Sequence, residues 1–183
     1  MESEHPFWYF AFASPESYLS AERILHVVDG PCEWTPIRSP VDQRAFRCAE
    51  ERQIAEQRIE LLAAERELQP LRWPPDFDEE LALRAATFAK SIGRGASFAL
   101  AALRQAYAGG ADLGDRDVVL IAAAACEMHP RAVLSALERE SVLAELDAAT
   151  ALARERGVRD VPALWLPDGT VLHGDGALGA LAA

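Results

Sequence analysis

The sequence is poor in several features that identify a function class directly. Its 183 residues suit one domain, or a small domain that carries an insertion. They include a single lysine, Lys90, so arginine supplies the other 17 of the 18 basic residues, against 29 acidic ones. A chain with a net charge of −11 offers little of the basic surface that nucleic acid or an anionic membrane needs. We therefore expect neither as a partner, whereas a small-molecule ligand is compatible with this charge.

Long hydrophobic runs and a basic leader are also missing. The first apolar run covers residues 7–13, follows an acidic start and is far shorter than the ~20 residues that cross a bilayer. The most apolar windows elsewhere, residues 97–102 and 118–125, are too short as well. We therefore expect a cytoplasmic protein without a signal peptide or a membrane span.

Cysteine is scarce, and its pattern matches no metal or redox motif. Cys32, Cys48 and Cys126 are odd in number and widely separated, and the sequence contains no C-x-x-C or His/Cys cluster. Each is interpreted as a free thiol in a reducing compartment. We therefore expect neither a bound metal nor a dithiol active site.

The N-terminal part of the sequence predicts a β-α-β unit. Residues 7–12 are apolar and aromatic on both faces, which is typical of a central strand buried on both sides. Residues 14–28 predict a helix that starts at a Ser-Pro pair. Residues 33–38 predict a second strand, and Pro36 indicates an edge position, because proline cannot donate a ladder hydrogen bond.

The rest of the sequence predicts a helical block and then a return to mixed structure. Alanine, arginine and glutamate dominate the middle, where glycine and proline separate the segments. The expected helices there cover residues 43–68, 78–92, 97–107, 115–128 and 130–137. The C-terminal part predicts a helix over 140–156, strands over 162–166 and 170–173 around a Pro-Asp-Gly turn, and a short helix over 177–181.

This order of elements predicts an α/β, thioredoxin-like fold with a four-stranded mixed sheet. The order is β-α-β, a helical block, and then α-β-β-α. Residues 1–42 and 139–183 would form the two parts of the thioredoxin-like domain. Residues 43–138 would form an inserted all-helical domain.

Three points in such a fold are candidates for one ligand site. Ser14 starts the first helix, where free N–H groups and a hydroxyl favour an anion such as a thiolate. Val161 and Pro162 enter a strand, and a cis bond between them would offer the Val161 backbone to an extended ligand. Asp175 precedes the last helix and could hold an ammonium group. An ordinary helix cap at Ser14 or Asp175 and a trans proline are the alternatives.

Tyr18, Trp73 and His173 are candidates for lining a substrate cleft. Tyr18 would bring a second hydroxyl, Trp73 would stand between the sheet and the helical block, and His173 lies near the expected ligand end. Core packing for the two aromatic residues and a surface or capping role for His173 are the alternatives.

Several stretches together resemble one family. Residues 7–19, F-W-Y-F-A-F-A-S-P-E-S-Y-L, are similar to the opening of the DsbA-like thioredoxin-fold family. The similarity lies in the branch of 2-hydroxychromene-2-carboxylate isomerases and kappa-class glutathione transferases. Residues 157–166, G-V-R-D-V-P-A-L-W-L, resemble its Gly-Val-x-Gly-Val-Pro-Thr strand, and residues 172–178, L-H-G-D-G-A-L, resemble its Phe/Trp-Gly-x-Asp-Arg-Leu ending. W-T-P-I at 34–37 and R-W-P-P at 72–75 complete a resemblance that covers nearly the whole chain.

The resemblance implies roles for individual residues. Ser14 matches the serine that hydrogen-bonds the glutathione sulfur in these proteins. Ser14 and Ser17 stand where the redox members carry Cys-x-x-Cys, so dithiol–disulfide exchange is not implied. Val161 and Pro162 match the residues at the cis proline, whose backbone pairs with the cysteinyl part of glutathione.

Three departures from the family pattern bear on glutathione binding. Glu16 replaces a Tyr or Trp beside the anion position, and Ala163 replaces the Thr after the proline. Gly176 and Ala177 stand where the family has an Asp, which binds the γ-glutamyl ammonium, and an Arg. Asp175, one position earlier, is then the candidate for that ammonium, with Gly176 beside it.

Two functions follow as expectations. The first is a glutathione-dependent isomerase or transferase of the 2-hydroxychromene-2-carboxylate isomerase type, in which a glutathione thiolate held by Ser14 acts on a small aromatic or electrophilic substrate. The second is a redox-inactive DsbA-like binding protein that no longer uses glutathione. The resemblance also implies a homodimer.

Overall fold

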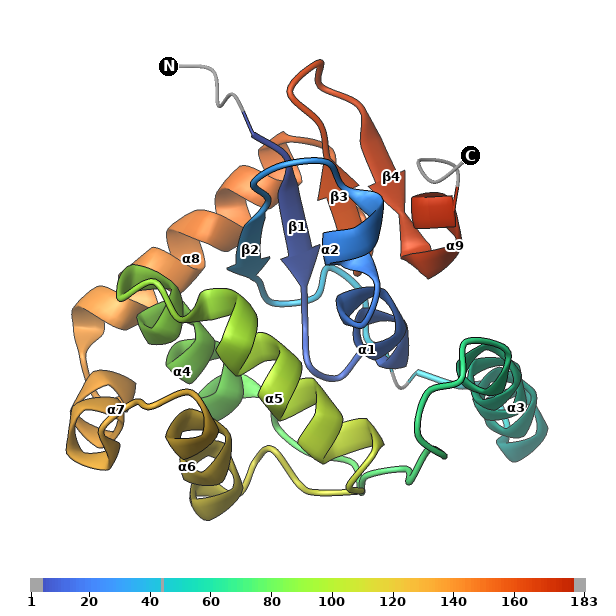
Figure 1. The fold of residues 1–183 in the computed structure, drawn as a ribbon, viewed down its shortest axis with the longest axis horizontal. Helices are drawn as coiled ribbons and strands as arrows, with labels where there is room; N and C mark the ends of the chain where they lie inside the picture. Colours follow the sequence, from blue (N-terminus) through green and yellow to red (C-terminus); the bar gives the residue numbers. More distant parts are fainter. Residues whose placement is uncertain (1–4, 44, 180–183) are drawn as a thin grey trace.

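The computed structural model describes residues 5–43 and 45–179 and confirms the predicted thioredoxin-like fold (Figure 1). Four strands form one sheet within these residues: β1 (Phe7–Phe10), β2 (Glu33–Pro36), β3 (Ala163–Trp165) and β4 (Val171–His173). Their order in the sheet is β2-β1-β3-β4. β1 pairs with β2 in parallel and with β3 in antiparallel fashion, and β3 and β4 form an antiparallel hairpin. Each of these pairings agrees with the sequence prediction.

β1 is the central strand because both of its faces are apolar. Successive side chains of a strand point to opposite faces, so Trp8 and Phe10 enter the large core while Tyr9 enters a smaller core behind the sheet. Pro36 lies opposite Phe10 at the end of β2, which is an edge strand, as predicted from its missing N–H.

Helices surround the sheet and form a block below it in Figure 1. The described residues form nine: α1 (Pro15–Ala21), α2 (Ile24–Val27), α3 (Ala49–Glu65), α4 (Glu80–Ser91), α5 (Gly95–Tyr107), α6 (Arg116–Ala125), α7 (Pro130–Leu137), α8 (Glu140–Glu155) and α9 (Gly174–Leu178). α4 to α7 form the helical block, and α8 packs along β2. α3 lies beside α1, apart from α6 and α7.

Most helix boundaries differ from the prediction by a few residues, and three helices show how. The helix expected over 14–28 is divided into α1 and α2, because the Arg23 N–H bonds three residues back to the carbonyl of Ser20 and this tighter turn ends α1. The helix expected over 43–68 is the shorter α3. Its start at Ala49 follows Arg47, whose backbone N–H donates a hydrogen bond to the Glu51 carboxylate in the first turn of the helix. α9 begins before the expected 177–181, whose last residues lie outside the described part.

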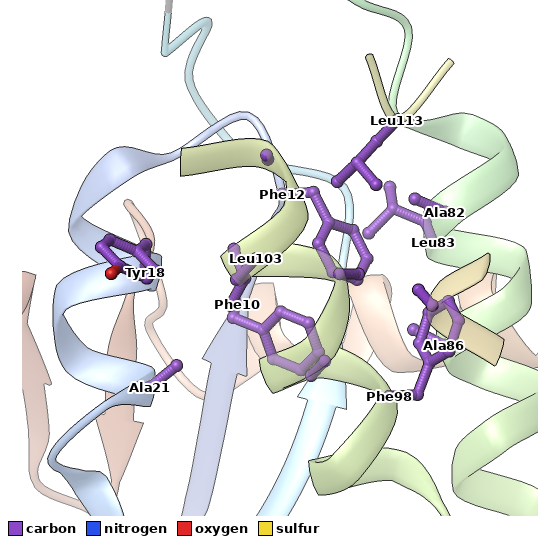
Figure 2. Packing of buried hydrophobic residues seen from close by; sticks show 14 of the residues in the cluster. Phe10, Phe12, Tyr18, Ala21, Ala82, Leu83, Ala86, Phe98, Leu103 and Leu113 are labelled. Atoms are coloured by element: carbon purple, nitrogen blue, oxygen red, sulfur yellow. The ribbon is translucent and has the colours of Figure 1, made fainter. Parts of the chain in front are cut away.

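One continuous core joins the sheet to the helical block. Phe10 and Phe12 pack with Leu83 of α4 and with Phe98 and Leu103 of α5 (Figure 2). The rings of Phe12 and Phe98 meet edge to face with their centroids 6.3 Å apart. This shared core fixes the segment that leads into α1 relative to the helices. The boundaries of the inserted domain stay a prediction.

No helix among the described residues is both long and apolar enough to cross a bilayer. The same residues contain no group of three or more His, Cys, Asp or Glu side chains placed to hold a metal ion. Cys32, Cys48 and Cys126 are free thiols. The cytoplasmic location and the homodimer stay predictions.

Candidate functional site

A cavity of about 200 Å³ lies where three segments meet. The start of α1 contributes Ala13, Pro15 and Glu16 to its lining, and the residues before β3 contribute Asp160 and Val161. Helix α3 and the loop that follows it provide the third part. The cavity therefore lies between the thioredoxin-like part and the helical part of the chain, and of the residues predicted to bind glutathione only Val161 lines it.

Aromatic rings form the apolar part of this cavity. Trp73, which the sequence predicted for a substrate cleft, lines it together with Phe46, Phe77 and Tyr107. Two of these rings are held by hydrogen bonds. The Trp73 indole N–H donates to Glu60 Oε1 at 2.7 Å, and the Tyr107 hydroxyl donates to a backbone carbonyl at 2.9 Å. Rings that are fixed in this way offer a preformed surface to a flat apolar ligand.

Two arginines of α3 bring charge to the cavity, and both have acidic partners. Arg52 Nε lies 2.8 Å from a carboxylate oxygen of Glu56, and its Nη2 lies 3.5 Å from Asp76. Arg58 forms an ion pair with Glu16 across two elements, α3 and α1. The cavity thus combines aromatic rings with ion-paired arginines.

Ser14 is buried, with 1% of its surface exposed, and does not line the cavity. Its hydroxyl makes no helix-capping bond; Oγ donates instead to the carbonyl of Val161 at 3.1 Å. Ser14 and Val161 therefore lie in contact, and the Val161–Pro162 bond is cis. Ser17, the second residue of the Ser-x-x-Ser pair, is fully buried, and its Oγ has no hydrogen-bond partner in the described structure.

The Val161 N–H is also bound within the chain. It donates to Oδ1 of the preceding Asp160 at 2.7 Å. The same Oδ1 accepts a hydrogen bond from Gln43 Nε2 at 2.6 Å, so a residue before α3 holds the aspartate in place. Both backbone groups of Val161 therefore have partners inside the protein.

Asp175 is 2% exposed and forms a buried ion pair. Arg66, just after α3, donates to both carboxylate oxygens, at 2.9 and 2.5 Å, and Arg23 lies 3.9 Å away. This carboxylate is therefore compensated by guanidinium groups. The sequence analysis expected it to be available for an ammonium group of a ligand.

Glu16 lies against the start of α9. Its Oε2 accepts a hydrogen bond from the Asp175 N–H at 3.1 Å, while Oε1 pairs with Arg58. A Cβ built on Gly174, which has φ of +75°, would lie 3.1 Å from the same Oε2, so the glycine leaves room for this carboxylate. Glu16 departs from the family pattern in the sequence, but these contacts could not be predicted from it.

The remaining predicted residues lie away from the cavity. Tyr18 is buried and stacks on Tyr107 with centroids 5.8 Å apart (Figure 2 shows its ring set apart from the other core rings). Burial raises the pKa of its hydroxyl, and the charge of Glu22 adds to this effect. His173 is exposed, and its Nε2 accepts the Arg159 N–H at 3.0 Å. Gly176 is exposed, and Pro162 is buried and does not line the cavity.

Sequence reasoning missed most of the cavity wall on α3. The mixed acidic and basic residues of this helix are typical of a solvated face with ion pairs four residues apart, and Arg52–Glu56 is such a pair. The available signal was the set of apolar positions on this helix: Ile59 is buried and Leu62 is partly buried, whereas Ile54 and Leu61 are exposed. Apolar side chains that are buried on an otherwise exposed helix indicate a second face that contacts the rest of the protein.

Comparison with known proteins places the chain in a family. The chain belongs to the DSBA-like thioredoxin domain family, whose model matches residues 7–183. No protein with curated annotation matches the sequence significantly. Among solved structures, a 2-hydroxychromene-2-carboxylate isomerase superposes with a TM-score of 0.83 at 16% identity, over 96% of this chain and 91% of that one. The cytosolic disulfide reductase DsbM from Pseudomonas aeruginosa, solved with GSH, gives 0.66 at 14% identity, over 88% and 85%. These similarities establish the fold.

The residues that the resemblance assigns to glutathione do not fit the tripeptide as they are arranged. The Ser14 hydroxyl and both backbone groups of Val161 are hydrogen-bonded within the chain. The Asp175 carboxylate is paired with Arg66, and the Asp175 N–H is bonded to Glu16. Each polar group that would hold the ligand already has an internal partner, and breaking such a bond costs part of any binding free energy.

Proposed function

We propose that this chain is a redox-inactive DsbA-like protein that binds a small aromatic molecule in the cavity between α1 and α3, without glutathione. The observation that carries the proposal is the aromatic cavity wall beside the start of α1, in which hydrogen bonds fix Trp73 and Tyr107 and Phe77 lies with them. The absence of cysteine at Ser14 and Ser17 supports the redox-inactive assignment, because thiol–disulfide exchange requires a thiolate at this position.

The size of the cavity sets the size of the ligand. An engineered protein cavity of ~150 Å³ holds benzene. A cavity of about 200 Å³ therefore accepts one aromatic ring with small substituents. The ion-paired arginines Arg52 and Arg58 provide hydrogen-bond donors near the rings, and these suit oxygen substituents on the ligand.

A cavity-filling variant tests this proposal. The probe is 2-hydroxychromene-2-carboxylate, and the readouts are tryptophan fluorescence and the shift in melting temperature on ligand addition. Ala55→Phe places a ring in the cavity and should weaken binding at least about tenfold. Ala64→Phe, on the exposed side of the same helix, is the matched control and should bind as the wild type does. Equal binding by both variants would place the ligand elsewhere and contradict the proposal.

A second candidate is a glutathione-dependent isomerase of the 2-hydroxychromene-2-carboxylate isomerase type. The observation that favours it is the TM-score of 0.83 with such an isomerase over 96% of this chain. The resemblance of residues 7–19 to that family supports Ser14 as the serine that would hold the glutathione sulfur. Turnover of 2-hydroxychromene-2-carboxylate that requires glutathione and is lost in Ser14→Ala would establish this candidate over the first. Binding of the aromatic probe without any effect of glutathione would favour the first.

A further inference from the structure

Two acidic side chains accept hydrogen bonds from backbone N–H groups near the cavity. The Asp160 carboxylate accepts the Val161 N–H at 2.7 Å, and the Glu16 carboxylate accepts the Asp175 N–H at 3.1 Å. These acceptors come from segments far apart in the sequence, yet both line the same cavity. Each satisfies a backbone donor, at Val161 in the cavity wall and at Asp175 behind Glu16.

Both acidic residues stand at positions where the family motif has another residue type. Asp160 is the fourth residue of G-V-R-D-V-P, where the matching Gly-Val-x-Gly-Val-Pro has a glycine without a side chain. Glu16 stands where the family has Tyr or Trp. The two departures have the same effect: each adds a carboxylate, and each carboxylate accepts a hydrogen bond from a backbone N–H group.

Each carboxylate is held by a further side chain. Gln43 Nε2 donates to Asp160 Oδ1 at 2.6 Å, and Arg58 pairs with the second oxygen of Glu16. A ligand that took the place of either carboxylate would have to break two contacts and leave an acidic group to find new partners. Loss of a charge-assisted hydrogen bond is more costly than loss of a neutral one.

Charge adds to this effect. Glutathione carries two carboxylates and one ammonium group, and the Asp175 carboxylate that could receive the ammonium is already bonded to Arg66. The ammonium group of the tripeptide would therefore find no free carboxylate at Asp175.

We propose that Glu16 and Asp160 are built-in substitutes for the acceptor groups of a glutathione-like tripeptide and that these two side chains exclude it from the site. This inference rests on the proposed glutathione-free function and names the residues responsible for it. A small aromatic ligand needs neither N–H group, so the aromatic part of the cavity stays available while the two carboxylates keep their places.

The test is calorimetric titration of reduced glutathione into the wild type and the double variant Glu16→Ala/Asp160→Gly. The double variant should bind at least about tenfold more tightly than the wild type. Each single variant frees one N–H group and should gain part of this affinity, so the test does not depend on the folding of the double variant. Glu56→Ala is the matched control, because Glu56 is a cavity carboxylate whose partner is Arg52, and it should bind glutathione as weakly as the wild type.

The outcomes separate the inference from the proposed function. If folded variants bind glutathione no better than the wild type, Glu16 and Asp160 are not the excluding residues and the inference is overturned, while the glutathione-free function stands. If the wild type itself binds glutathione as tightly as the double variant, both the inference and the glutathione-free function are wrong. A gain in Glu56→Ala equal to that of the double variant would attribute the effect to charge in general and also overturn the inference.

Discussion

The buried ion pair between Arg66 and Asp175 should contribute strongly to stability. Arg66→Ala leaves a carboxylate that is 2% exposed with Arg23, 3.9 Å away, facing it. Removal of one partner of a buried pair costs about 3–5 kcal/mol. Since Arg66 is 21% exposed and Arg23 remains, we take the lower end, about 3 kcal/mol. For a chain of this size, about 3 kcal/mol lowers the melting temperature by roughly 6–12 °C.

Thermal denaturation followed by far-UV circular dichroism measures this change. Arg47→Ala is the control, because Arg47 is 89% exposed in its pair with Glu51 and its loss should leave the melting temperature unchanged. The double variant Arg66→Met/Asp175→Leu should recover most of the loss, since an apolar pair of similar volume avoids the cost of burying charge. A melting temperature for Arg66→Ala equal to that of the control would refute the reasoning.

Three further predictions concern other parts of the molecule. Burial raises the pKa of the Cys32 thiol to about 12, so iodoacetamide at pH 8 should label the exposed Cys48 and leave Cys32 unmodified in mass spectrometry; equal labelling would contradict this. Burial alone would raise the pKa of Glu80, but hydrogen bonds from Arg38 and a second arginine outweigh it and lower the pKa below its ordinary value of 4.5. The resulting stability is present above pH 4.5 and lost as the pH falls through the lowered pKa, so urea denaturation should show a smaller acid-induced loss in Glu80→Gln than in the wild type. Tyr107→Phe removes a buried hydroxyl that donates to a backbone carbonyl and should lower the free energy of unfolding by about 1 kcal/mol; no change would show that the bond contributes nothing.

Most of the fold could be predicted because local patterns determine its elements. The aromatic run at residues 7–12 has apolar side chains on both faces, and only a central strand of this sheet buries both. The Pro-Asp-Gly turn defines the hairpin of β3 and β4, and Pro130 begins α7 as proline at a first helical position does. Helix ends were less accurate, because a side-chain contact such as that of Glu51 with the Arg47 backbone decides them.

The contacts of the site were harder to predict because they join distant positions. Glu16 and Asp175 are 159 residues apart, and Arg66 and Asp175 are 109 apart. No periodicity in a sequence specifies which arginine will meet which carboxylate over such a separation. The position of Ser14 beside Val161 was predictable because the order of elements predicts a thioredoxin-like fold, in which the start of the first helix and the entry to the third strand converge.

The edges of the sheet have a consequence for how the protein behaves at high concentration. An open edge offers unpaired backbone groups to strands of other molecules, which is the first step of fibril growth. Here β2 ends at Pro36, which has no N–H to offer, and β4 has three residues and leads directly into α9. Each edge is thus too short or too interrupted to template another strand. We expect concentrated solutions of the folded protein to stay free of thioflavin-positive fibrils.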